Sequence, residues 1–126
     1  MNKTITIILS TYNEKNSIES TINSLIKNIK DVEIVVVDDN SPDGTFDILE
    51  KIDYPHLKKF KRKNIRGLAT AFLLGLINSK GQIIGWLDSN MGSLAEKFPE
   101  MISNLENSDI VLLSRYVAGG KDERNK

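Results

Sequence analysis

A continuous run of β-branched residues, Ile34 to Val37, constrains the fold more than any other feature of the chain. The run is short enough to be one strand, and it is apolar enough to be covered on both faces, as in a parallel sheet. Asp38 and Asp39 follow it directly. Because open α/β sheets bind ligands at the carboxyl ends of their strands, these two carboxylates mark a candidate site.

The remaining residues supply alternating strand and helix patterns. We expect strands at 4–10, 34–37, 57–60, 82–87 and 109–114, and helices at 16–29, 46–52, 68–77 and 94–105. The helix at 68–77 is apolar enough to be packed on more than one side, with close packing at Gly75. Pro99 indicates that the last helix properly starts there, since proline suits a first turn. Short connections between these elements predict an α/β fold, with a mostly parallel sheet and helices on both faces.

The segment after the acidic pair predicts a turn. Ser41-Pro42-Asp43-Gly44 matches a type I turn, and Thr45 is placed to cap the helix that follows. Two acids beside this turn suit a ligand that donates hydrogen bonds, such as ribose hydroxyls or base N–H groups, or a divalent cation. The other interpretation is that one Asp caps the turn and the other is solvated.

Composition narrows the classes of function. The 126 residues suit one domain, which we expect at 1–120 with a charged tail at 121–126. Lys+Arg and Asp+Glu both number 17, and this balance gives no indication of a nucleic-acid partner. The absence of cysteine excludes disulfides and thiolate metal sites, and the single His56 excludes a two-histidine site. No signal peptide or membrane-spanning run is recognisable, which predicts a cytoplasmic protein.

Polar side chains follow three of the expected strands, and parallel topology brings these strand ends to one edge of the sheet. They lie at 11–14, at 38–39 and at 88–90. In the first group, Tyr12 offers a flat face on which a nucleobase can stack. Glu14, together with Asp39 of the second group, can accept hydrogen bonds from a ribose or a base.

The third group carries candidate metal ligands. Asp88 and Asn90 are separated by one residue, so they point the same way and can reach a metal ion bound to a pyrophosphate. Arg66 and Arg115 can neutralise phosphate oxygens. Taken singly, each of these residues also has an ordinary explanation as a turn residue or a surface charge. Their convergence on one sheet edge is what favours a binding site.

Four motifs extend this interpretation by resemblance. Residues 10–14 (STYNE) are similar to a P-T-Y-N-E opening, and residues 67–71 (GLATA) to G-L-G-T-A. Residues 109–120 (DIVLLSRYVAGG) are similar to D-I-V-x-G-S-R-Y-x-x-G-G. Residues 35–45 (VVVDDNSPDGT) look like the signature of dolichyl-phosphate mannosyltransferases and their bacterial polyprenyl-phosphate relatives. Motifs in this order resemble family 2 glycosyltransferases, which implies a Rossmann-like GT-A fold of which this chain is the nucleotide-binding part.

The resemblance implies an inverting enzyme that moves a sugar from a GDP- or UDP-sugar to a polyprenyl or dolichyl phosphate. The expected contacts to the donor are Thr11, Tyr12, Glu14, Asp38, Asp39, Arg66, Gly67, Asp88 and Ser89. Asp88 and Arg115 are the expected catalytic residues, near the pyrophosphate and its metal ion. Asp88 and Asn90 are the expected ligands of Mg²⁺ or Mn²⁺.

Two departures from the family pattern affect these expectations. The Asp-x-Asp metal motif reads Asp88-Ser89-Asn90, and a neutral carbonyl in place of a carboxylate weakens divalent-ion binding. Gly92 supplies no side chain where the family usually has a polar one. The chain also stops where the acceptor half is expected. Apolar surface left uncovered there predicts self-association, and a lipid acceptor predicts peripheral contact with a membrane.

Three other functions stay open. A non-catalytic nucleotide-sugar-binding module would keep the site without turnover. A phospho-receiver domain would use Asp38, Asp39, Asp88 and Ser114, but about thirty residues precede its acidic strand here. A dinucleotide-binding dehydrogenase is disfavoured because no G-x-G-x-x-G follows the first strand.

Overall fold

The computed structural model describes residues 3–114, 116 and 120. The chain forms two compact units, 1–96 and 97–126, and the whole sheet of the described residues lies in the first. The expected tail at 121–126 lies outside the described residues. None of the helices in the described part of the chain is long and apolar enough to cross a bilayer.

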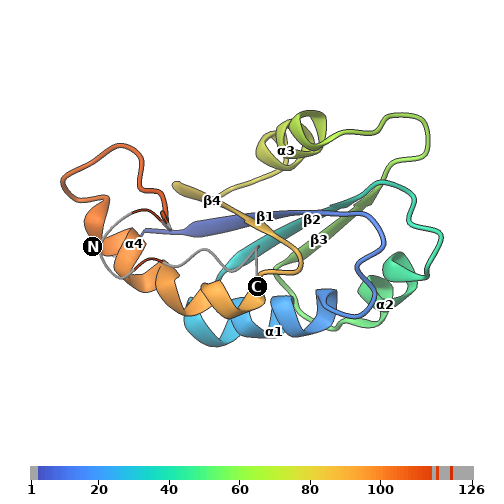
Figure 1. Ribbon diagram of the computed structural model, residues 1–126, viewed down its shortest axis with the longest axis horizontal. Helices are drawn as coiled ribbons and strands as arrows, with labels where there is room; N and C mark the ends of the chain where they lie inside the picture. Colours follow the sequence, from blue (N-terminus) through green and yellow to red (C-terminus); the bar gives the residue numbers. More distant parts are fainter. Residues whose placement is uncertain (1–2, 115, 117–119, 121–126) are drawn as a thin grey trace. The chain divides into compact units, whose positions relative to one another are not determined.

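Four parallel strands form the sheet of the first unit (Figure 1). They are β1 (Ile5–Thr11), β2 (Glu33–Asp38), β3 (Leu57–Lys61) and β4 (Ile83–Asp88), in the spatial order β3-β2-β1-β4. In the pairing of β1 with β2, Thr11 lies opposite Asp38, and in the pairing of β1 with β4, Ser10 lies opposite Asp88. The predicted parallel α/β sheet is confirmed, and its register brings the polar strand ends to one edge.

Helices cover both faces of this sheet, as predicted. Helices α1 (Ile18–Asn28) and α2 (Thr45–Lys51) lie on one face, and α3 (Leu68–Ile77) lies on the other (Figure 1). The central strand β2 is enclosed between them, and the whole Ile34–Val37 run is 0% exposed. Burial of this run on both faces explains why it is continuously apolar rather than alternating.

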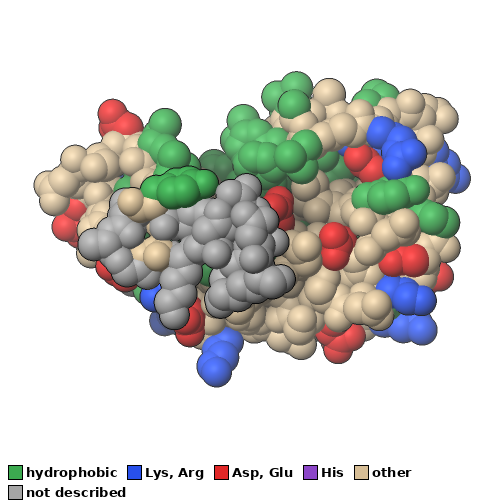
Figure 2. Space-filling view, in the orientation of Figure 1, with side chains coloured by type: hydrophobic (Ala, Val, Ile, Leu, Met, Phe, Trp, Pro, Cys, Tyr) green, Lys and Arg blue, Asp and Glu red, His purple; other side chains and the backbone are tan. Residues whose placement is uncertain are grey.

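Helix α3 packs against the sheet through one side only. A Cβ on Gly75 would lie 2.5 Å from Cγ2 of Ile8, so only glycine permits this close approach. On its outer side, Leu73 is 54% and Ile77 is 71% exposed. Figure 2 shows hydrophobic side chains gathered over this helix. The expectation of packing on more than one side is therefore wrong for the described residues.

Beyond β4, the observed secondary structure differs from the prediction at two places. The expected helix at 94–105 is a 3₁₀-helix, Gly92–Lys97, followed by α4 (Phe98–Asn104). Pro99 lies in the first turn of α4, as predicted. The expected strand at 109–114 is wrong, because these residues pair with no strand in the described part of the chain. Strand propensity alone does not form a strand, since its backbone groups need a partner.

Candidate functional site

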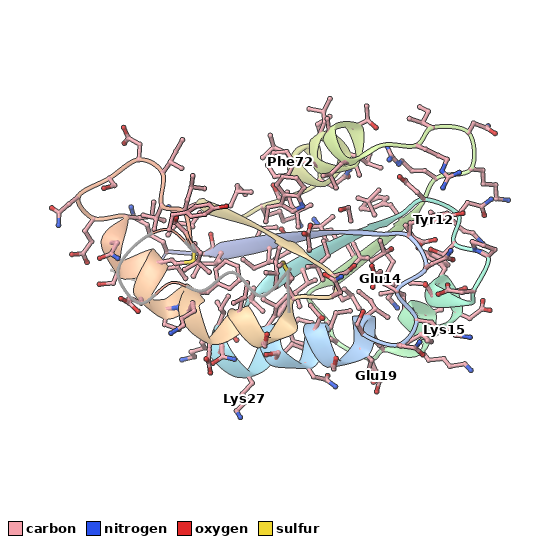
Figure 3. The ribbon with its side chains drawn as sticks, in the orientation of Figure 1. Tyr12, Glu14, Lys15, Glu19, Lys27 and Phe72 are labelled. Carbon is pink, nitrogen blue, oxygen red and sulfur yellow. The ribbon has the colours of Figure 1, made fainter. Side chains whose placement is uncertain are left out.

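A cleft of about 390 Å³ opens at the carboxyl ends of the strands. Its walls are Ser10, Thr11, Tyr12, Glu14, Asp39, Arg66, Gly67, Leu68, Asp88, Ser89 and Asn90. The structure thus brings together residues from three strand ends and from the loop after β3. Tyr12 and Glu14 lie just beyond the end of β1 (Figure 3). Of the described residues predicted for the site, only Asp38 does not line the cleft.

Asp38 is instead buried beneath the cleft, with 0% exposure. Its Oδ1 accepts hydrogen bonds from the Thr11 hydroxyl at 2.7 Å and the Ser41 hydroxyl at 2.6 Å. Its Oδ2 accepts one from the Ser41 N–H at 2.9 Å. Asp38 therefore holds the turn after β2 onto the end of β1, and its oxygens face protein donors rather than the cleft.

The loop after β1 is fixed by side chains from the loop after β2. The backbone N–H of Asn13 donates to the Ser41 hydroxyl at 2.9 Å, and that of Glu14 donates to the Thr45 hydroxyl at 3.0 Å. The next N–H, of Lys15, donates to Oδ2 of Asp43 at 3.2 Å. Three successive backbone donors are thus satisfied by one short segment. This clamp holds Tyr12 and Glu14 at the rim.

The same contacts correct the expected role of Thr45. The N-cap of α2 is Gly44, at φ +94°, and Thr45 is the first helical residue. Its hydroxyl donates to Asp43 and accepts from the Glu14 N–H. Partial desolvation raises the pKa of the Asp43 carboxyl, but hydrogen bonds from Thr45 and Lys15 outweigh this effect and hold the pKa below its usual value. Asp43 therefore acts as a charged acceptor for both loops.

Asp39 faces the cleft but is already bound to protein groups. Arg62 donates from Nε to Oδ1 at 2.7 Å, and its Nη2 lies 2.6 Å from the same oxygen. The Gly67 N–H donates to Oδ2 at 3.1 Å. The sequence left two interpretations of the acidic pair, a ligand-binding pair or one Asp that caps the turn beside one that is solvated. The structure matches neither in full, because Asp38 holds the turn and Asp39 forms a shielded ion pair.

Sequence reasoning did not identify Arg62. A usable signal existed in the strand register, because Asp38 lies opposite Lys61 in the β2–β3 pairing. The residues that follow this pair, Asp39 and Arg62, are therefore neighbours of opposite charge. Without the register, Arg62 is one of several cations in a basic loop.

Arg66, by contrast, lies over the ring of Tyr12, with its guanidinium carbon 4.3 Å from the ring centroid. A cation in this position is attracted by the negative face of the ring. Tyr12 remains 43% exposed. An aromatic face and a cation therefore stand together at the rim of the cleft. Arg115, the other predicted phosphate contact, lies outside the described residues.

The end of β4 is held through Ser89, which leaves the side chains of its two neighbours free. The hydroxyl of the buried Ser89 donates to the Ser10 carbonyl at 3.1 Å, and the Ser89 carbonyl accepts from Thr21 at 2.6 Å. Asp88 and Asn90 on either side are exposed. Neither of these two side chains forms a hydrogen bond or ion pair with the residues that the structure describes.

Gly92 has a packing reason for lacking a side chain. A Cβ at this position would lie 2.8 Å from Cα of Thr21 in α1, closer than real Cβ contacts come. The Gly92 carbonyl also accepts a hydrogen bond from Ser24 at 2.9 Å. The polar side chain that the family pattern leads one to expect there is thus excluded by close contact with α1.

The donor set at this rim fits a divalent cation that arrives with a phosphate ligand. No cluster of three acidic or histidine side chains exists among the described residues. Asp88 offers one carboxylate and Asn90 one amide oxygen, both hard donors. Mg²⁺ in particular is commonly held by one or two carboxylates plus substrate phosphates and water. These two residues are the candidate ligands, and a diphosphate would complete the coordination.

The comparisons with known proteins agree with the motifs. The profile of glycosyl transferase family 2 matches residues 6–126. The chain belongs to this family. One relative, the dolichol-phosphate mannosyltransferase of Pyrococcus furiosus, is 35% identical over 94% of the chain and 35% of its own length. A second, the UDP-Glc:alpha-D-GlcNAc-diphosphoundecaprenol beta-1,3-glucosyltransferase of Escherichia coli, is 33% identical over 84% of the chain and 43% of its own length.

A solved mannosyltransferase structure shows the same architecture. The mannosyltransferase of Pyrobaculum calidifontis, in complex with GDP-Man and Mn²⁺, is 25% identical to this chain, with a TM-score of 0.72. The match covers 87% of this chain and 34% of that protein. The chain therefore spans less than half the length of each of these three proteins.

Proposed function

We propose that this chain is the donor-binding part of a glycosyltransferase that passes a sugar from a nucleoside diphosphate to a polyprenyl phosphate. The observation that carries the proposal is that Tyr12, Asp39 and Asp88, which are far apart in the sequence, line the same cleft. An aromatic face, a carboxylate acceptor and a free carboxylate match the base, the ribose and a metal-bound diphosphate in turn. Family membership supports the same assignment.

The nucleoside binds at the rim formed by β1 and β2. Tyr12 stacks with the base, while Glu14 and Asp39 accept hydrogen bonds from the ribose or the base. Thr11, Gly67 and Ser89 shape the floor and walls through their backbone and short side chains. Asp38 contributes indirectly, by holding the turn that carries Asp39.

The diphosphate binds at the rim formed by β4. Asp88 and Asn90 would hold a divalent cation, Mg²⁺ or Mn²⁺, and such an ion would supply positive charge beside the departing diphosphate. Arg66 supplies a further cation from the opposite wall of the cleft, and Arg115 is assigned the same task through the resemblance of its motif. As the family resemblance implies, an acceptor oxygen bonds to the anomeric carbon from the side opposite the diphosphate. The bond between that carbon and the diphosphate breaks, the nucleoside diphosphate leaves, and the configuration at the carbon is inverted.

A polyprenyl phosphate acceptor fits the chemistry of this cleft. Its phosphate is already ionised near neutral pH, so it attacks without a general base, and a hydroxyl acceptor would need one. The dolichol-phosphate mannosyltransferase relative supports a lipid-phosphate acceptor. The glucosyltransferase relative makes a lipid-linked sugar hydroxyl the second candidate. Either acceptor is held in a bilayer, so the proposal includes peripheral contact with a membrane.

Calorimetric titration tests donor binding. UDP, GDP, UDP-glucose and GDP-mannose are each titrated into folded protein, with and without Mn²⁺. We expect binding of at least one nucleotide, strengthened by Mn²⁺. If none of the four gives heat with protein that circular dichroism shows to be folded, the proposal is wrong.

A transfer assay separates the enzyme from a non-catalytic binding module. Protein that binds a donor is incubated with the labelled donor, Mn²⁺ and undecaprenyl phosphate in detergent. Label in the lipid phase supports transfer to a lipid phosphate. Donor binding without any lipid-linked label favours the binding module.

A further inference from the structure

We infer that Arg62, outside the cleft lining, is a positioning residue that holds Asp39 and the loop at 62–67 in the geometry needed to bind the nucleotide. This inference rests on the proposed function. It adds a residue that neither the motifs nor the chemistry of the cleft lining singles out. Its basis is the set of contacts made by one guanidinium group.

The Arg62 guanidinium joins three parts of the first unit. Its Nε and Nη2 both bind Oδ1 of Asp39, at the end of β2. Its Nη2 also donates to the Gly67 carbonyl at 2.9 Å, and its Nη1 donates to the Thr70 hydroxyl in α3 at 2.8 Å. The Arg62 backbone N–H donates to the Asp38 carbonyl at 2.8 Å. A planar group with fixed donor directions can make all of these contacts at once, which a lysine cannot.

The pairing limits what Asp39 can offer a ligand. A carboxylate has about four acceptor positions, two on each oxygen. Arg62 occupies both positions on Oδ1, and the Gly67 N–H occupies one on Oδ2. One position on Oδ2 therefore remains for a ribose hydroxyl or a base N–H. Arg62 fixes the carboxylate so that this position is presented to the cleft.

The same contacts close the loop after β3. Gly67 adopts φ +123°, a conformation that other residues rarely adopt, and both its N–H and its carbonyl are held by the Asp39–Arg62 pair. Gly67 and its neighbour Arg66 both line the cleft. Loss of Arg62 would release this loop, and with it one wall of the site.

Burial makes the pair resistant to screening. The side chains of Arg62 and Asp39 are 10% and 13% exposed. Ion pairs on an open surface contribute little and weaken in salt, whereas removing one partner of a shielded pair leaves a charge with poor solvation. Asp39 without Arg62 would therefore turn toward water and away from its present orientation.

The test compares Arg62→Gln with Lys63→Gln. Lys63 lies in the same loop, is exposed and makes no hydrogen bond or ion pair with the described residues, so its variant removes one charge and nothing else. Nucleotide affinity is measured by calorimetry with the nucleotide that wild type binds best. The Gly67 amide is followed by NMR in ligand-free protein, where its shift and exchange rate report the bond to Asp39.

We expect Arg62→Gln to weaken nucleotide binding about ten-fold or more and to speed exchange of the Gly67 amide. Arg62→Lys should restore part of the affinity, because it keeps the charge but not the fork of donors. Lys63→Gln should change affinity by less than about two-fold. Unchanged affinity or an unchanged Gly67 amide in folded Arg62→Gln would overturn the inference.

Two further outcomes keep the test decisive. If Arg62→Gln does not fold, Thr70→Ser, which keeps the hydroxyl, and Thr70→Ala are compared instead. The Thr70 hydroxyl accepts from Arg62 and donates to the Gly67 carbonyl at 3.2 Å, so Thr70→Ala should weaken binding by a smaller factor than Arg62→Gln, and Thr70→Ser should not. No effect of Thr70→Ala or Arg62→Lys on either readout would then overturn the inference. A wild type that binds no nucleotide refutes the proposed function itself, and the Gly67 amide still shows separately whether Arg62 holds the loop.

Discussion

The two rims of the cleft differ in how their acidic residues are held. On the β2 rim, Asp38 and Asp39 both have partners for each carboxylate oxygen, supplied by the end of β1 and by the loops after β2 and β3. On the β4 rim, the exposed side chains of Asp88 and Asn90 have no such partner among the described residues. The acidic side chains of the β2 rim are therefore fixed by protein contacts before a ligand binds, whereas the polar side chains of the β4 rim would gain their partners from the ligand.

This difference matches the chemistry proposed for each rim. Groups already held in place lose little freedom on binding, which favours specific recognition of a nucleoside. A carboxylate that remains hydrated and unpaired is available to a cation, whereas an arginine beside it would compete for the same oxygens. The comparison predicts that substitutions on the β2 rim alter stability, and that those on the β4 rim alter function alone.

The largest expected effect comes from Asp38→Ala. It removes the acceptor of three hydrogen bonds and leaves the Thr11 hydroxyl, buried at 3% exposure, without this partner. We expect a loss of about 2–4 kcal/mol in the free energy of unfolding. Urea denaturation followed by circular dichroism measures it. A loss below about 1 kcal/mol would mean that the β2 rim is less tightly built than its contacts indicate.

Asp88→Ala should have the opposite profile. Because Asp88 has no partner among the described residues, we expect the free energy of unfolding to change by less than about 0.5 kcal/mol. Removing the one carboxylate of the candidate metal site should weaken the Mn²⁺-dependent part of nucleotide binding by about ten-fold or more. Paired urea and calorimetric measurements on the same preparation test both statements. A stability loss with unchanged Mn²⁺ dependence would reverse the comparison between the rims.

The sequence could predict that polar residues gather at this edge of the sheet. It could not predict which of them face the cleft and which are buried beneath it. Polar residues after short apolar runs were sufficient to place 11–14, 38–39 and 88–90 together. Alternation along a strand implies that Asp38 and Asp39 face different ways, but it does not say which of them is buried. That choice depends on the tertiary partners Thr11 and Arg62, which lie far from the acidic pair in the sequence.

The segment at 109–114 shows the other limit of sequence reasoning. Its apolar, β-branched pattern predicts a strand as well as the Ile34–Val37 run does. The run at 34–37 has neighbours on both sides in the sheet, whereas Ile110 and Leu112 are 77% and 82% exposed. A residue pattern indicates that a segment suits a strand. Whether the strand forms depends on a neighbouring strand to pair with, and that neighbour is set by the tertiary fold.

A smaller effect is expected from Asn90→Asp, which adds a second carboxylate to the β4 rim. A charged oxygen in place of the amide should strengthen Mn²⁺ binding in the presence of nucleotide several-fold, since affinity rises with the number of charged ligands. Calorimetric titration of Mn²⁺ into the nucleotide complex measures the change. The matched control is Asn107→Asp, in the second unit and exposed, which should leave Mn²⁺ affinity unaltered. Equal effects of the two variants would remove Asn90 from the metal site.

The smallest effect concerns the pH dependence of the clamp, in which side chains of the loop after β2 bind the backbone of the loop after β1. The pKa of Asp43 is lowered from its usual value of 3.8, because the hydrogen bonds from Thr45 and Lys15 outweigh its partial desolvation. A lowered pKa in the folded state means that the unfolded chain binds the proton more readily, so this stabilisation is present above pH 3.8 and is lost as the pH falls through the folded value. The stability difference between wild type and Asp43→Asn should therefore shrink on acidification from pH 6 to pH 3, by less than about 1 kcal/mol, because solvent screens a partly exposed group. Urea denaturation across this range measures the difference, and a gap that widens toward low pH would show that the charge of Asp43 does not support the clamp.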